Sequence, residues 1–134
     1  MFRTESHIQV RYGETDQMGV LYHGNYATFY EIGRTEAFRY LGLTYREIEA
    51  KGIMMPVIEL WSKFHKPAFY DDKIKIVTII DRIPEYRMVT RAELYNEAGE
   101  LINQAEVQLA FIEKSKNKII EAPHFVKELL KPYF

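Results

Sequence analysis

The chain has 134 residues, of which 47% are hydrophobic and 28% charged, a composition typical of one soluble globular domain. Eighteen basic and nineteen acidic residues give a net charge of −1. This balance argues against a nucleic-acid partner, which requires a basic face. The chain has no cysteine, so it offers no disulfide, no thiolate nucleophile and no cysteine metal ligand.

The sequence gives no sign of export or of membrane insertion. No apolar run approaches the roughly 20 residues that span a bilayer. The first ten residues, MFRTESHIQV, lack the apolar core of a signal peptide, so we expect a cytoplasmic protein. The four histidines, at positions 7, 23, 65 and 124, show no spacing typical of a metal site, so we expect no metal.

The first half of the chain predicts a strand, a loop and a long helix. Alternation of Ile8, Val10 and Tyr12 predicts a strand over residues 6–12, and the loop Gly13–Gly19 follows. Helical spacing over residues 25–41 is carried by Tyr26, Phe29, Tyr30, Gly33, Ala37 and Tyr40. Gly42 ends this helix, and a shorter helical turn covers residues 45–50. Glycine inside a helix costs about 1 kcal/mol relative to alanine, so we expect Gly33 to permit close packing.

The second half predicts four strands, over residues 54–66, 73–82, 86–95 and 100–113, with a hairpin turn at 96–99 and a short helix after Pro123. Apolar and polar residues alternate in the last strand, which indicates an antiparallel sheet buried on one face. We interpret the order as a strand, a long helix and four strands in hairpin sequence, forming one α+β domain over residues 1–134. Because a single long helix leaves part of the sheet bare, we expect at least a dimer.

The segment from Arg11 to Tyr26, RYGETDQMGVLYHGNY, carries the candidate chemistry. It places Asp16 in a glycine-bracketed loop just before the start of a helix. A carboxylate there can attack a polarised carbonyl or activate water, while free N–H groups of the helix start stabilise the developing oxyanion. The alternative for Asp16 is a turn residue that satisfies local backbone donors.

The string from Tyr12 to Tyr26 resembles the signature of the hotdog-fold acyl-CoA thioesterases. It is most similar to the YbgC-like branch of the 4-hydroxybenzoyl-CoA thioesterase family. The match continues at Phe29, Glu31, Arg34 and Glu36, then at Lys66-Pro67-Ala68 and Tyr70-Asp71-Asp72. The resemblance implies a curved antiparallel sheet wrapped around one long helix. It also implies a dimer or tetramer that hydrolyses an acyl-CoA, which we expect to be short-chain, to a free acid and a thiol. Coenzyme A is part of the substrate, so no cofactor is expected.

The resemblance also assigns three candidate catalytic residues. Asp16 matches the catalytic carboxylate, which acts as a nucleophile or as a general base on water. His23 and Tyr12 match positions that assist at the same site. From the residues alone, a histidine placed like His23 is usually a cap or packing residue, and Tyr12 is equally a core residue.

Four further residues are candidates for substrate contact: Gly24, Asn25, Tyr26 and Lys66. Gly24 also suits a backbone position where a side chain does not fit. Asn25 and Tyr26 are equally capping and core residues. Lys66 is a candidate for the phosphates of coenzyme A, and its alternative is a solvated strand residue.

One departure from the family and several alternatives for the carrier, the carboxylate and the function stay open. Hydroxybenzoyl-specific members bind nucleotide phosphates through a basic cluster, and the equivalent stretch here reads Ile83-Pro84-Glu85-Tyr86. An acyl carrier protein is therefore an alternative to free coenzyme A. Another branch places its carboxylate on the helix, where Glu31 and Glu36 are available. A hydratase or dehydratase on the same fold, and a non-catalytic protein that binds acyl thioesters, are the functional alternatives.

Overall fold

The computed structural model describes residues 1–134 and contains three α-helices and eight strands. The helices are α1 (Tyr26–Tyr40), α2 (Tyr45–Ala50) and α3 (His124–Leu130). The strands are β1 (Phe2–Gln9), β2 (Ile53–Met54), β3 (Val57–Phe64), β4 (Lys73–Ile80), β5 (Arg87–Tyr95), β6 (Leu101–Ala110), β7 (Ile112–Glu113) and β8 (Lys118–Ile119). Short 3₁₀ turns cover Tyr12–Glu14, His23–Asn25 and Lys131–Tyr133.

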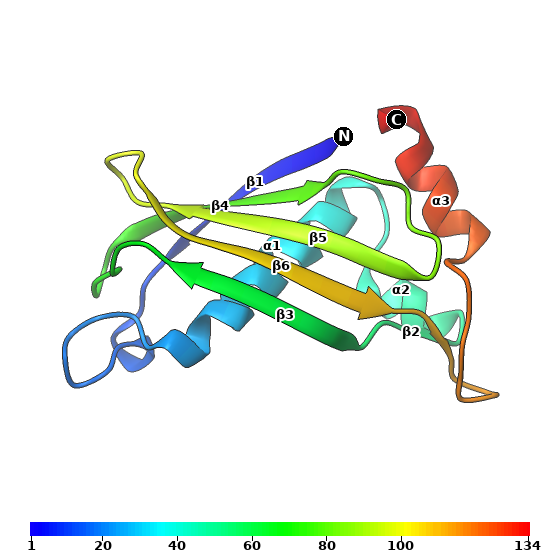
Figure 1. The fold of residues 1–134 in the computed structure, drawn as a ribbon, viewed down its shortest axis with the longest axis horizontal. Coiled ribbons are helices and arrows are strands. Elements are labelled where there is room, and N and C mark those ends of the chain that lie inside the picture. Colours follow the sequence, from blue (N-terminus) through cyan, green and yellow to red (C-terminus); the bar gives the residue numbers. More distant parts are fainter.

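The main sheet has five antiparallel strands in the order β1-β4-β5-β6-β3, and α1 lies against one of its faces (Figure 1). The predicted α+β hotdog fold is confirmed. The predicted hairpin between the second and third strands is wrong, since β3 pairs with β6 and β1 occupies the place beside β4. The physical reason is burial: β4 is buried at six of its eight positions, so it needs a neighbour on both sides.

Helix α1 confirms the predicted helix to within one residue at each end. Its buried face is formed by Tyr26, Phe29, Tyr30, Gly33, Arg34, Ala37 and Phe38. Tyr40, which the helical pattern also included, is exposed instead. The helix ends as expected at Gly42, where the Leu43 N–H donates to the Phe38 carbonyl at 2.9 Å and closes the last turn.

Gly33 brings α1 close to the sheet, as its position inside the helix predicts. A Cβ atom at this residue would lie 2.5 Å from Thr78 Oγ1 and 2.6 Å from Ile76 Cγ2, both on β4. No side chain fits in that space, so the lower helix propensity of glycine is offset by close packing. As a result α1 packs chiefly against β1 and β4, on one half of the sheet.

The remaining boundaries differ from the sequence prediction by a few residues. The first strand begins at Phe2 and ends at Gln9, so Tyr12 lies in a 3₁₀ turn rather than in the strand. The predicted strand 54–66 is divided into β2 and β3 around Pro56, because proline cannot donate to a sheet ladder. Residues 100–113 are likewise divided into β6 and β7, and β7 forms a small second sheet with β2 and β8.

The two ends of the chain meet beyond one end of the main sheet, at the upper right of Figure 1. The Met1 amino group donates to the Tyr133 carbonyl at 2.6 Å. The Phe2 ring, which is almost fully buried, packs edge-on against the Tyr133 ring with centroids 4.8 Å apart. The loop between β1 and α1 lies at the opposite end of the sheet (Figure 1).

Candidate active site

The loop between β1 and α1 is a small, tightly tied hairpin. The Asp16 N–H donates to the Val20 carbonyl at 2.9 Å, and the Gly19 N–H donates back to Asp16 at 3.0 Å. Gly19 takes a φ of +79°, a conformation that favours glycine in such a turn. The Leu21 N–H then donates to the Ala68 carbonyl at 2.8 Å, which ties the hairpin to the segment between β3 and β4. The position of Asp16 is therefore fixed by backbone hydrogen bonds on both sides.

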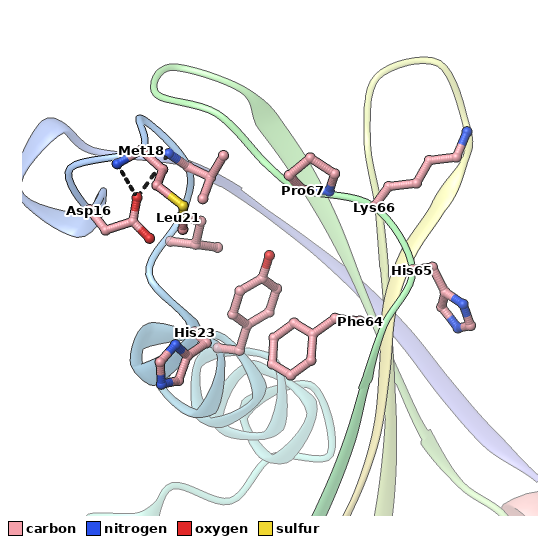
Figure 2. Close-up of a pocket in the computed structure, with 10 residues that line it drawn as sticks. Asp16, Met18, Leu21, His23, Phe64, His65, Lys66 and Pro67 are labelled. Carbon is pink, nitrogen blue, oxygen red and sulfur yellow. Dashed lines mark hydrogen bonds between the residues drawn. The ribbon is translucent and has the colours of Figure 1, made fainter.

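The Asp16 carboxylate is half-buried and is held by its own loop. Its Oδ1 accepts hydrogen bonds from the N–H groups of Met18 at 2.9 Å and Val20 at 3.4 Å, shown as dashed lines in Figure 2. The Oδ2 atom accepts no hydrogen bond from the protein. Asp16 thus satisfies local backbone donors, as a turn residue does. It also keeps one carboxylate oxygen free, as a catalytic carboxylate requires.

A second anchor of the loop is Glu14, which is buried. Its carboxylate accepts hydrogen bonds from the Arg11 backbone at 2.7 Å and from the Arg11 guanidinium at 3.1 Å. Burial alone would raise the pKa of Glu14, but these contacts with Arg11 outweigh it and hold the pKa below its ordinary value. The Glu14 carbonyl accepts from Tyr22 N–H and from Asn25 Nδ2, each at 2.9 Å, so Glu14 joins the loop to the start of α1.

The start of α1 supplies free backbone donors. The 3₁₀ turn His23–Asn25 leads into the helix, with the Asn25 N–H donating to the Tyr22 carbonyl at 2.9 Å. The N–H groups of His23 and Gly24 donate to no protein acceptor, as the first N–H groups of a helix usually do not. A Cβ atom at Gly24 would lie 2.5 Å from the exposed Tyr22 ring, so a larger residue would require this ring to move. Two unpaired N–H groups therefore lie at the positive end of the helix dipole.

A cavity of about 310 Å³ lies between the Asp16 loop, the start of α1 and the end of β3. Figure 2 shows Asp16 and Met18 on one side of it, with Phe64 and Pro67 across from them. It is lined by Asp16, Met18, Val20, Leu21, His23, Tyr26, Phe64, His65, Lys66 and Pro67. The carboxylate thus meets a largely apolar space of a size suited to a small ligand.

The structure brings four of the seven predicted site residues to this cavity: Asp16, His23, Tyr26 and Lys66. Tyr26 is 3% exposed, and burial raises the pKa of its phenol, so the ring is uncharged. His23 is exposed, makes no hydrogen bond to Asp16, and its ring contacts the Tyr22 ring at a centroid distance of 4.4 Å. Lys66 lies at the cavity rim, where its ammonium group pairs with Glu100.

The other three predicted residues lie beside the cavity without lining it. Tyr12 is 78% exposed, and its ring packs edge-on against Tyr70 with centroids 5.6 Å apart. Tyr12 is therefore not a core residue, which was the alternative to a role at the site. Its role at the site stays a prediction. Gly24 and Asn25 belong to the turn at the helix start, where Asn25 ties the turn to Glu14 through its side chain.

Sequence reasoning did not single out Phe64, which lines the cavity from β3. In the register with β6, Leu60, Ser62 and Phe64 lie opposite Val107, Ala105 and Asn103, all buried. These positions of β3 therefore face α1. The alternation of residues in the strand that ends just before Lys66-Pro67 could have indicated that Phe64 faces the helix. To use it, one must know that β3 pairs with β6, which the sequence did not indicate.

The helical carboxylates that served as alternatives lie elsewhere. Glu36 pairs with Arg39 on the helix surface, and Glu31 lines a different cavity beside Arg34 and Tyr45. No group of three or more histidine, aspartate or glutamate side chains is arranged to hold a metal ion. None of the helices has the length and apolar character needed to cross a bilayer.

Comparisons with known proteins agree with this geometry. A family model described as the thioesterase-like superfamily matches residues 10–130. YneP of Bacillus subtilis, whose name assigns it provisionally as an acyl-CoA thioesterase, is 36% identical over 121 residues, or 90% of this chain and 88% of its own. The acyl-CoA thioester hydrolase YbgC of Escherichia coli is 31% identical over 111 residues, or 83% of each chain.

Among solved structures, the DHNA-CoA thioesterase of Staphylococcus aureus superposes with a TM-score of 0.86 at 36% identity. The superposition covers 100% of this chain and 85% of that one. The resemblance first seen in residues 12–26 thus extends over nearly the whole sequence and the whole fold. The chain belongs to the thioesterase-like superfamily, as a hotdog-fold thioester hydrolase of the YbgC-like branch.

Proposed function

We propose that this protein hydrolyses short-chain acyl-CoA thioesters to a carboxylic acid and free coenzyme A, with Asp16 as the catalytic carboxylate. One observation carries the proposal. An aspartate with a free oxygen shares a cavity with His23, at the start of the 3₁₀ turn that leads into α1, and the N–H groups of His23 and Gly24 in this turn are unpaired. The names of YneP, YbgC and the Staphylococcus aureus structure support acyl-CoA as the substrate.

Two routes use this arrangement. In the first, the free Asp16 oxygen attacks the thioester carbonyl, the thiolate leaves, and water hydrolyses the resulting anhydride. In the second, Asp16 takes a proton from a water molecule that attacks the carbonyl directly, and the thiolate leaves in the same way. In both routes the carbonyl oxygen becomes negative, and the N–H groups of His23 and Gly24 stabilise it.

The other candidate residues hold the substrate around this centre. Tyr26 provides an apolar wall for the acyl group, and Asn25 fixes the turn that carries the two N–H donors. Lys66 binds a phosphate of coenzyme A in place of Glu100. This exchange is possible because the Lys66–Glu100 ion pair is exposed at the cavity rim. Tyr12 is exposed beside the loop, where it contacts the pantetheine arm and assists the catalytic centre.

The active form is a homodimer, or a tetramer built from two dimers, in the cytoplasm. The supporting observation is strand β3, an edge of the sheet that pairs only with β6. Val57, Ile58, Leu60, Trp61 and Phe64 all expose apolar side chains along it. An unpaired apolar edge is a template for a second strand, and a second copy of β3 supplies one of equal length.

The test is release of free thiol from acetyl-, butyryl-, hexanoyl-, palmitoyl- and benzoyl-CoA, comparing wild type with Asp16→Asn. We expect Asp16→Asn to lower kcat/KM by ~100-fold or more on every substrate that wild type cleaves. The matched control is Asp71→Asn, which makes the same change at an exposed loop aspartate outside the cavity. Its kcat/KM should stay within about 2-fold of wild type.

Each other outcome selects a different function. Activity that survives in Asp16→Asn would move the carboxylate to Glu31 or Glu36. Loss of the double-bond absorbance of an enoyl-CoA without thiol release would identify a hydratase. Saturable binding of acyl-CoA without turnover would identify a binding protein. Thiol release only from acylated acyl carrier protein would show that this protein, rather than coenzyme A, carries the acyl group.

A further inference from the structure

Two aromatic rings line the cavity beside Asp16, where it borders α1 and β3. Tyr26 on α1 and Phe64 on β3 pack edge to face, with ring centroids 4.8 Å apart and planes at 82°. Both rings line the cavity, and no residue further along α1 or further back along β3 does. We propose that this pair, the aromatic wall, sets the longest acyl chain that the site accepts. The inference rests on the proposed thioester hydrolysis and identifies residues that select its substrates.

The wall has a second layer behind it, made of hydroxyl and amide groups. Tyr30 lies one turn beyond Tyr26 on α1, and Ser62 lies two residues before Phe64 on the same face of β3. Their hydroxyl oxygens are 2.6 Å apart. Neither residue lines the cavity, so the space ends at the aromatic pair.

These groups form a closed ring of three hydrogen bonds. The Tyr30 hydroxyl donates to Asn103 Oδ1, and Asn103 Nδ2 donates to Ser62 Oγ at 3.2 Å. Because a hydroxyl carries one proton, Ser62 then donates to Tyr30. Tyr30 and Asn103 are almost fully buried.

An acyl chain that passed the wall would have to separate these groups. Each buried polar group left without a partner would cost more free energy than one added methylene gains by burial. The barrier is therefore both steric, from the rings, and polar, from the groups behind them.

The size and lining of the cavity agree with a short acyl group. Its volume of about 310 Å³ lies near the lower end of the roughly 300–1,000 Å³ of small-molecule sites. Met18, Val20, Leu21 and Pro67 add apolar lining beside the wall, which suits an alkyl chain, while Asp16, His23, His65 and Lys66 supply the polar part of the lining.

Phe64 is the residue to change. Tyr26 is buried in the core and contacts Phe29, so its truncation would disturb the helix. Phe64 is 51% exposed and lies at the end of an edge strand, so a smaller side chain there removes fewer core contacts. Phe64→Leu keeps an apolar residue on the edge and provides a second, milder variant.

The experiment measures kcat/KM on a series from acetyl-CoA to palmitoyl-CoA for wild type, Phe64→Leu and Phe64→Ala. We expect wild type to prefer butyryl-CoA over palmitoyl-CoA by ~10-fold or more. The palmitoyl-to-butyryl ratio should rise ~10-fold or more in Phe64→Ala and by less in Phe64→Leu. The matched control is Phe69→Ala, which removes an aromatic ring of the same exposure that does not line the cavity.

The outcomes separate the two proposals. Thiol release with an unchanged chain-length ratio in both Phe64 variants would overturn the aromatic wall and leave the hydrolysis intact. Wild-type turnover that is equal on palmitoyl- and butyryl-CoA would do the same. A ratio that rises equally in Phe69→Ala would show that any loosening of this region suffices, which also overturns the wall. Absence of turnover on every chain length would overturn the hydrolysis and the wall together.

Discussion

Strands β1 and β3 are the two edges of one sheet, yet they present different chemistry to solvent. Along β1 the exposed positions are Arg3, Glu5, His7 and Gln9, all polar. Along β3, Val57, Ile58, Leu60, Trp61 and Phe64 each keep 44–51% of their surface exposed. Charged side chains keep an edge from pairing with another chain, whereas an apolar edge invites it. The β1 edge is therefore complete in the single chain, and the β3 edge is suited to a partner.

The helix is responsible for this difference. Because Gly33 lets α1 approach β4 closely, the helix packs chiefly against the β1–β4 half of the sheet and contacts β3 through Tyr26 and Tyr30. The same offset leaves room for the cavity, which opens where β3 ends and α1 begins. One close contact on the β1–β4 half thus leaves the β3 half more open to a ligand.

The largest expected effect comes from placing a charge on the apolar edge. We expect Leu60→Asp to weaken self-association by ~100-fold or more, about 2.7 kcal/mol, because the change appears twice in a two-fold interface. Sedimentation equilibrium over a range of protein concentrations measures it. His7→Asp, the control on the polar edge, should leave the oligomer intact. An unchanged oligomer in Leu60→Asp, or dissociation by His7→Asp, would reverse the assignment of the two edges.

The next effect concerns the close contact on the β1–β4 half. Gly33→Ala should lower the free energy of unfolding by about 1–3 kcal/mol, because overpacking against Thr78 and Ile76 exceeds the gain in helix propensity. Urea unfolding measures the change. At Gly13 a Cβ atom would meet no atom within 4 Å, so Gly13→Ala should change stability by less than about 0.5 kcal/mol. If Gly33→Ala proved stabilising, the helix would have room to shift over the sheet.

A smaller, opposite pair of effects concerns buried hydroxyl groups on the two halves. Ser62 on β3 takes part in the hydrogen-bonded ring with Tyr30 and Asn103, so Ser62→Ala should cost about 1–2 kcal/mol. Thr78 Oγ1 on β4 is buried without any partner, so Thr78→Val should stabilise the protein by about 1 kcal/mol. Urea unfolding measures both changes in the free energy of unfolding. If both variants were destabilised, or both stabilised, the hydrogen-bond assignment would be contradicted.

The smallest effect is the dependence of stability on pH through Glu14. Because its folded pKa lies below the unfolded value of about 4.3, the Glu14–Arg11 contact stabilises the fold above that pH and loses this effect as the pH falls through the folded pKa. Glu14→Gln should therefore lower the melting temperature by about 1–4 °C at neutral pH. The difference from wild type should vanish in acid. A gap that stayed constant with pH would mean that shape, rather than charge, matters at this residue.

Most of the local structure was predictable because the signals are local. The spacing of Tyr26, Phe29, Tyr30 and Ala37 gave α1 to within one residue, and the loop around Asp16 is tied by contacts between residues close in sequence. The resemblance in residues 12–26 also led to the correct family. Asp16, His23 and Tyr26 consequently lie together at the cavity, as expected.

Most of the errors concern contacts between distant parts of the chain. Nothing in β3 indicates that it pairs with β6, more than forty residues later, instead of with β4. The position of Phe64 in the cavity depends on that pairing, and so does the buried ring of Tyr30, Ser62 and Asn103. Tyr12 was predicted to lie in the first strand because it continues the alternation of Ile8 and Val10. The strand ends at Gln9, and alternation alone does not show where a strand ends.

Because Met1 and Tyr133 are in contact, the chain is suited to circular permutation, in which the two present ends are joined and new ends are opened elsewhere. The two ends lie together at the end of the sheet away from Asp16, so a short peptide linker could join them without crossing the cavity (Figure 1). New ends opened in the exposed turn at residues 114–117 would interrupt the β7–β8 hairpin and, beside it, the hydrogen bond from Lys114 N–H to the Gly52 carbonyl. A circular permutant of this kind would carry its new ends on the small sheet, away from the loop that holds Asp16.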